Sequence, residues 1–99
     1  MDITVTQDNA KSIISIPDTL NAITSPFLKN TLSEVISAAD EIDLDFSETG
    51  LVSSAGLRVL MQAEKNVQKS GKIMTLKNVS PEVMEVFNMT GVSKIFKIV

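Results

Sequence analysis

The sequence predicts an α/β fold whose mixed β-sheet opens with an antiparallel hairpin, continues with βαβ units and carries its helices mainly over one face. Two β-branched runs that flank a turn signal predict the hairpin. Each later strand-like run follows a segment with helical spacing of its apolar residues, so right-handed parallel crossovers are expected. At 99 residues the chain can bury one hydrophobic core, and we expect a single domain over residues 1–99.

The N-terminal third of the chain predicts two short strands and a helix. The strands are expected at DITVTQ and KSIISIP, which lie on either side of an Asp-Asn-Ala turn signal. A helix is predicted over about residues 25–39, where apolar side chains recur at helical spacing. Its N-cap is expected to be Ser25, because Pro26 fits the first helical position, where its missing N–H costs nothing.

The middle of the chain predicts a half-buried strand and a second helix. Residues 41–46 alternate apolar side chains with Asp43 and Asp45, so we expect helices over one face of this strand and water or other polar groups over the second. The two aspartates are interpreted as polar surface rather than as paired catalytic carboxylates. The second helix is predicted over about residues 55–70, with a broad apolar arc. Glu64 lies within that arc, and its role stays open between the arc's edge, a lysine partner and a contact with another protein.

The C-terminal part of the chain predicts a strand, a third helix and a last strand. The first of these strands is expected at KIMTLKN. The helix begins with Ser80 and Pro81, carries Glu82 in its first turn and stops at Gly91, which together are typical start and stop signals. The segment KIFKIV is expected to form the last strand of the sheet.

The composition excludes several classes of function. The chain contains no histidine and no cysteine, so a Ser-His-Asp or Cys-His mechanism cannot operate within it, and zinc loses its usual ligands. We therefore expect no enzymatic activity, no metal and no cofactor. The net charge of −3 argues against nucleic acid as a partner. No long apolar run and no basic-then-apolar signal are present, so we expect a cytoplasmic location without membrane insertion.

The stretch LVSSAGLRVL, residues 51–60, places two serines between a strand-like run and a helix. We expect Ser53 or Ser54 to cap the helix through its hydroxyl, because serine is among the best N-cap residues. A nucleophile elbow would need Gly-x-Ser-x-Gly and a histidine, and a Walker loop would need a lysine before the serine; both are absent here. Phosphorylation remains, since a helix N-terminus stabilises an added phosphate locally.

The segment LDFSETGLVSSAGLRVL, residues 44–60, resembles the signature of the STAS domain of bacterial anti-sigma factor antagonists. The signature is a hydrophobic strand, a short loop and a serine-rich junction that opens a helix. Residues 71–98 are similar to the second half of that family, with a Ser-Pro-initiated helix and a late F-x-x-x-G stretch. Residues 16–32 occupy the place of the family's Gly-x-Leu-Asp loop and first helix. The resemblance therefore covers nearly the whole chain and implies a STAS fold.

The resemblance implies that Ser54, with Ser53 as second choice, is phosphorylated by a cognate anti-sigma factor that is also a serine kinase. Unphosphorylated antagonists of this family bind the anti-sigma factor and free the sigma factor, and a PPM-type, metal-dependent serine phosphatase reverses the phosphorylation. Three departures from the family pattern stand out. Ser53 replaces an acidic residue that often precedes the phosphorylated serine, Asn21 replaces the loop aspartate, and the C-terminal helix of longer members is missing.

A partner that senses Ser54 must cover the surface around it. The strand-to-helix loops PDTLNAIT and SETGLVSS should meet at the carboxyl ends of the parallel strands, beside the start of the second helix. For Arg58 a solvated helix face, and for Met61 a place in the core, stay open as alternatives. The expected partner-binding residues are Asp18, Asn21, Thr24, Gly50, Val52, Ser53, Ser54, Arg58 and Met61.

Two other functions stay open at this point. The chain could be a STAS interaction module that is not switched by phosphorylation, such as a subunit or scaffold component. It could also be a sensing subunit for a small molecule such as a nucleotide, since some relatives of this fold bind such ligands.

Overall fold

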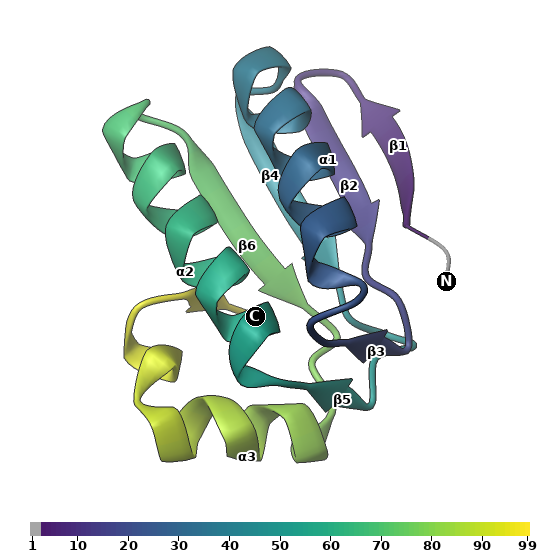
Figure 1. Ribbon diagram of the computed structural model, residues 1–99. Helices are drawn as coiled ribbons and strands as arrows, with labels where there is room; N and C mark the ends of the chain where they lie inside the picture. The colour runs from purple at the N-terminus through teal and green to yellow at the C-terminus, as the bar shows by residue number, and fades with distance from the viewer. Residues whose placement is uncertain (1–2) are drawn as a thin grey trace.

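The sheet opens with an antiparallel hairpin and continues with parallel strands in the computed structural model, which describes residues 3–99 (Figure 1). Its five strands follow the order β1-β2-β4-β6-β7, while β3 and β5 form a separate parallel pair. The strands are β1 (Thr4–Asp8), β2 (Lys11–Ser15), β3 (Thr19–Leu20), β4 (Glu41–Asp45), β5 (Leu51–Val52), β6 (Ile73–Lys77) and β7 (Lys97–Ile98). The helices are α1 (Ser25–Ala38), α2 (Ser54–Lys69), α3 (Pro81–Thr90) and the 3-10 helix η1 (Val92–Lys94).

The connections of the sheet follow the predicted topology. β1 pairs antiparallel with β2, and the turn between them places Asn9 at a φ of 58°, a left-handed conformation that asparagine tolerates better than most residues. β4 pairs parallel with β2 and with β6, and β7 pairs parallel with β6. Each parallel connection crosses over through a helix, so the predicted mixed sheet with βαβ units is confirmed.

Helices α1 and α2 lie side by side over one face of the sheet (Figure 1). Between them and the strands lies the core, in which Leu28 of α1, Leu60 of α2 and Leu44 of β4 have no exposed surface. The apolar positions at helical spacing are the ones that the helices bury, because each helix must remove one stripe of its surface from water. Within the described residues, no helix is long and apolar enough to span a membrane.

Helix α3 lies across the end of the sheet, next to β5 (Figure 1). Its start is the predicted one, because the hydroxyl of Ser80 accepts a hydrogen bond from the N–H of Val83 at 3.3 Å. It ends at Gly91, whose φ of 80° suits glycine. Phe87 anchors the helix, with its ring 6.1 Å from that of Phe46 and 5.6 Å from that of Phe96 in edge-to-face contacts.

Asp43 lies on the second face of the sheet, where water or other polar groups were expected, but it is buried rather than part of an exposed polar surface. Its residue surface is only 5% exposed, because Lys11 of β2 and Lys77 of β6 reach it from either side. The carboxylate oxygen Oδ2 lies 3.4 Å from the ammonium of Lys11 and 2.8 Å from that of Lys77. Asp45, two residues later, is half-buried. The burial of Asp43 between two lysines depends on the register of the sheet, so the sequence alone does not reveal it.

Two predicted helix caps are wrong. The residue before α1 is Thr24, Ser25 is the first helical residue, and neither side chain caps the helix. Ser53 occupies the N-cap position of α2, but its hydroxyl makes no cap hydrogen bond and is buried without a partner among the described residues. The backbone N–H of Ser53 instead donates to the carbonyl oxygen of Leu20 at 2.8 Å, so the pairing of β3 with β5 sets where α2 begins.

Candidate functional site

The two predicted loops meet at one end of the sheet, as expected from the parallel topology. The small β3–β5 pair joins them, and its hydrogen bonds are continued by the N–H of Gly50, which donates to the carbonyl oxygen of Asp18 at 2.9 Å. The hydroxyl of Thr49 is buried and donates to the carbonyl oxygen of Pro17 at 2.8 Å. These contacts form a platform, which we define as residues 17–20 and 49–53, directly before α2.

Gly56 allows the first turn of α2 to pack against this platform. A Cβ atom at Gly56 would lie 2.8 Å from the side-chain Cγ and 2.9 Å from the carbonyl oxygen of Leu20. Both distances are too short for real carbon contacts, and the carbonyl oxygen already accepts the N–H of Ser53. The glycine of the Ser-Ser-Ala-Gly stretch therefore has a steric reason, since glycine is required where a helix approaches backbone closely.

Ser54 is the first residue of α2, and its side chain is exposed. A phosphate at this position would lie near the free N–H groups and the positive end of the helix dipole. Arg58 is exposed one turn later and forms no ion pair with the described residues. The junction thus presents an accessible hydroxyl in an environment that favours negative charge.

The other predicted site residues differ in their exposure. Asp18 and Gly50 are exposed, while Asn21, Ser53 and Met61 are half-buried, Met61 against the core. Thr24 and Val52 are buried. The exposed and half-buried residues can meet a partner directly, whereas the two buried ones can only hold the surface in place.

Asn21 has a clear structural role in the loop before α1. Its side-chain oxygen Oδ1 accepts the backbone N–H of Ile23 at 2.9 Å and that of Thr24 at 3.1 Å. The hydroxyl of Thr24 in turn donates to the carbonyl oxygen of Thr19 at 2.8 Å. An aspartate could accept the same bonds, so the substitution seen in the family motif keeps the turn and removes a charge.

Three exposed apolar side chains beside the platform were not among the site residues predicted from the sequence. Ile23 is 75%, Leu51 56% and Phe27 52% exposed. Single exposed apolar residues are ordinary, but these three come from the β3–α1 connection, from β5 and from the first turn of α1, which lie at the same end of the molecule (Figure 1). The available signal was a large apolar residue at each of three positions next to the predicted loops.

Glu64, whose role the sequence left open, has a buried carboxyl group with incomplete hydrogen bonding. It is 7% exposed, its Oε2 accepts the side-chain amide of Gln68 at 2.8 Å, and its Oε1 has no partner among the described residues. Burial raises the pKa of Glu64 above its ordinary value, against a smaller lowering by the Gln68 hydrogen bond. The ionised carboxylate is therefore a cost to the folded state at neutral pH.

We expect Glu64→Gln to raise the free energy of unfolding at pH 7 by about 1 kcal/mol, because it removes a buried charge and leaves a hydrogen-bonding amide. The gain should shrink as the pH falls through the raised pKa of Glu64, since the folded wild type then takes up a proton before the unfolded chain does. Urea unfolding between pH 4 and 8 measures this difference. The exposed Glu34→Gln serves as control, and an equal effect of both substitutions would contradict the prediction.

Comparisons with known proteins place the whole described chain in one structural class. The family model described as "Mlab, STAS domain" matches residues 3–99. A Thermotoga maritima protein described as an anti-sigma factor antagonist has a TM-score of 0.87 at 21% identity, and the match covers 97% of this chain and 84% of that protein. The phosphorylated Bacillus cell fate determinant SpoIIAA has a TM-score of 0.78 at 16% identity, and the match covers 99% of this chain and 91% of SpoIIAA. A sulfate transporter family protein from Wolinella succinogenes has a TM-score of 0.77 at 17% identity, and the match covers 94% of this chain and 79% of the structure of that protein. At these identities the structural likeness establishes the fold.

Proposed function

We propose, from the premise that this chain belongs to the STAS domain family, that it is a bacterial anti-sigma factor antagonist switched by phosphorylation of Ser54. In this proposal the unphosphorylated protein binds a cognate anti-sigma factor that is also a serine kinase, and binding releases a sigma factor. Phosphorylation of Ser54 ends the interaction, and a PPM-type serine phosphatase restores it. The protein acts through binding and catalyses no reaction itself.

The observation that carries this proposal is the exposed hydroxyl of Ser54 at the first position of α2. A kinase needs access to the hydroxyl, and the helix N-terminus accommodates the phosphate without a change of fold. The buried hydroxyl of Ser53 supports Ser54 over its neighbour as the modified residue.

The surface around Ser54 supports a protein partner rather than a substrate. Exposed Ile23 and Leu51 supply apolar contacts of the kind that interfaces bury at their centre, while Asp18 and Arg58 supply a polar rim. Leu51 and Asp18 stand on the hydrogen-bonded backbone of the platform, so little conformational entropy is lost there on binding.

The test is phosphorylation of the recombinant full chain by candidate serine kinases from the same genome, with ATP and Mg²⁺, read by intact mass. We expect one added phosphate in the wild type and in Ser53→Ala, and none in Ser54→Ala. A phosphate that persists in Ser54→Ala would overturn the assignment of the site. Loss of binding on phosphorylation is then measured with the same kinase as binding partner.

A second candidate function is a STAS interaction module that is not switched by phosphorylation. The likeness to a sulfate transporter family protein favours it, because it shows this fold within another kind of protein. A partner complex whose affinity is the same for wild type and Ser54→Asp would support this function. A subunit that senses a nucleotide would instead show a melting temperature that rises with added nucleotide.

A further inference from the structure

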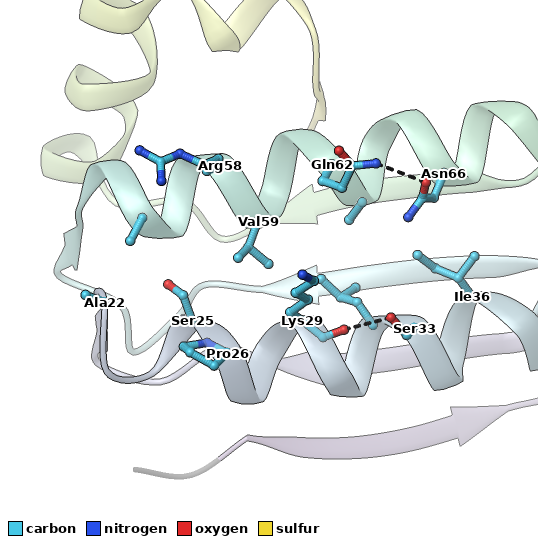
Figure 2. Close-up of a pocket in the computed structure, with 13 residues that line it drawn as sticks. Ala22, Ser25, Pro26, Lys29, Ser33, Ile36, Arg58, Val59, Gln62 and Asn66 are labelled. Carbon is cyan, nitrogen blue, oxygen red and sulfur yellow. Dashed lines mark hydrogen bonds between the residues drawn. The ribbon is translucent and has the colours of Figure 1, made fainter.

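A groove of about 510 Å³ runs between α1 and α2 on the side away from the sheet (Figure 2). Its apolar lining comes from both helices, with Leu32 and Ile36 of α1 facing Val59 and Ala63 of α2. The volume lies within the range of pockets that bind small organic molecules. The groove is thus large enough for a ligand with an apolar body.

The groove is basic although the chain is acidic. Lys29 and Arg58 line it, and its continuation of about 420 Å³ toward the other end of the helices adds Lys69 and Lys72. Among residues 3–99, no aspartate or glutamate lines either part, whereas the whole chain has a net charge of −3. Figure 2 shows the amine of Lys29 in the gap between the two helices. This charge selects anions.

Ser25 supplies a hydrogen-bond donor without an acceptor at one end of the groove. The residue is 3% exposed, and its hydroxyl has no hydrogen-bond partner among the described residues. Figure 2 shows this hydroxyl directed from α1 toward α2, and Ser25 is one of the residues that line the groove. A buried hydroxyl without a partner is costly, so an acceptor placed here would satisfy it.

The Ser25 end is also where both helices begin. α1 starts at Ser25 and α2 at Ser54, and the helices run in the same direction beside each other (Figure 1). Ala55, in the first turn of α2, lines the same end of the groove. Two helix dipoles therefore point their positive ends at this position, which favours a negatively charged group.

We propose that this groove binds a small amphipathic carboxylate. The carboxylate sits at the end where the helices begin, accepts a hydrogen bond from the hydroxyl of Ser25 and pairs with the ammonium of Lys29, with Arg58 at the rim. The aliphatic body lies on Leu32, Ile36, Val59 and Ala63. The groove lies beside Ser54 and shares Arg58 with the proposed partner surface, but ligand binding in it does not depend on phosphorylation of Ser54.

The chemistry of the lining favours a carboxylate with a hydrocarbon body over more polar anions. Apolar side chains cover most of the groove beyond Ser25 and Lys29, so a ligand gains from burying hydrocarbon there. A single carboxylate matches one ammonium and one hydroxyl, whereas the several charges of a nucleotide would leave phosphate oxygens over apolar surface.

Calorimetric titration of the full chain with decanoate tests the proposal. We expect saturable binding at one site, at least about tenfold weaker binding of decanol, and about tenfold weaker binding of decanoate to Lys29→Glu, since each change removes a charge-assisted hydrogen bond. Lys65→Glu is the matched control, because Lys65 is exposed on α2 outside the groove and its replacement changes the net charge equally.

Ser25→Ala provides a second variant that keeps the fold, because it removes a buried polar group that has no partner. It should bind decanoate several-fold more weakly at an unchanged or raised melting temperature. Binding that is not saturable, equal binding of decanol, or equal losses in Lys29→Glu and Lys65→Glu would overturn the proposal. Binding of ATP or GTP in the absence of decanoate binding would overturn it as well.

Discussion

Phosphorylation of Ser54 is expected to lower the affinity for the anti-sigma partner by about a thousandfold, under the proposed function. The phosphate adds a charge of about −1.5 to −2 at neutral pH. A single like-charge contact at about 4 Å costs roughly 4 kcal/mol at an effective dielectric constant of 20, which corresponds to about three orders of magnitude in affinity. The exposed position of Ser54 at the start of α2 means that this effect needs no movement of the fold.

The dissociation constants of phosphorylated and unphosphorylated protein, measured by calorimetry with the purified partner, check this expectation. Ser54→Asp should show a smaller loss in the same direction, because aspartate carries one charge on a shorter side chain. Ser37→Asp is the control, since Ser37 is exposed on α1 and gains the same charge away from the platform. Equal affinities for Ser37→Asp and Ser54→Asp would show that the charge at the junction is not sensed.

Gly56→Ala is expected to destabilise the protein by about 1–3 kcal/mol through overpacking. In an isolated helix the same substitution would be favourable by about 1 kcal/mol, so the sign of the change reports the steric contact directly. The new Cβ would meet both the side chain and the carbonyl oxygen of Leu20, and the carbonyl is backbone that is already held by the N–H of Ser53. The platform must shift, and partner binding should weaken with it.

Gly50→Ala is the matched control for stability. Among the described residues, no atom beyond its two chain neighbours lies within 4 Å of a Cβ built at Gly50, so alanine there should leave the free energy of unfolding unchanged or slightly raised. Urea unfolding of the two variants at the same pH measures the difference. A Gly56→Ala protein as stable as the wild type would mean that Leu20 can move without cost.

The topology could be predicted from sequence because its signals are local. Apolar side chains two apart indicate the strands, those at helical spacing indicate α1, α2 and α3, and the Ser80-Pro81 start of α3 is confirmed down to the cap hydrogen bond. β3 and β5 could not be predicted, because two residues are too few to show a period. The meeting of the two loops was predicted from the rule for parallel sheets, while the hydrogen bonds that join them were not.

The serines show most clearly where prediction from sequence ends. Ser25 was expected to cap α1, Ser53 or Ser54 was expected to cap α2, and the family resemblance favoured Ser54 over Ser53 as the phosphorylated residue. In the structure the hydroxyls of Ser25 and Ser53 are buried without partners, and Ser54 is exposed. The direction of the side chains at these positions depends on how β3 and β5 pair and on how α2 packs. A local sequence pattern does not contain that information.

By itself the sequence determined the order of the elements, the mixed sheet with its helices over one face, the absence of histidine and cysteine chemistry, and the likeness to the STAS family. Only the tertiary structure decided which hydroxyl is accessible, which carboxyl groups are buried, and that a basic groove runs between α1 and α2. The physical reason is that periodicity is a property of neighbouring residues, whereas burial and charge pairing depend on residues that are far apart in the chain. Asp43 is the example: Lys11 and Lys77 enclose it because the sheet places β2 and β6 on either side of β4.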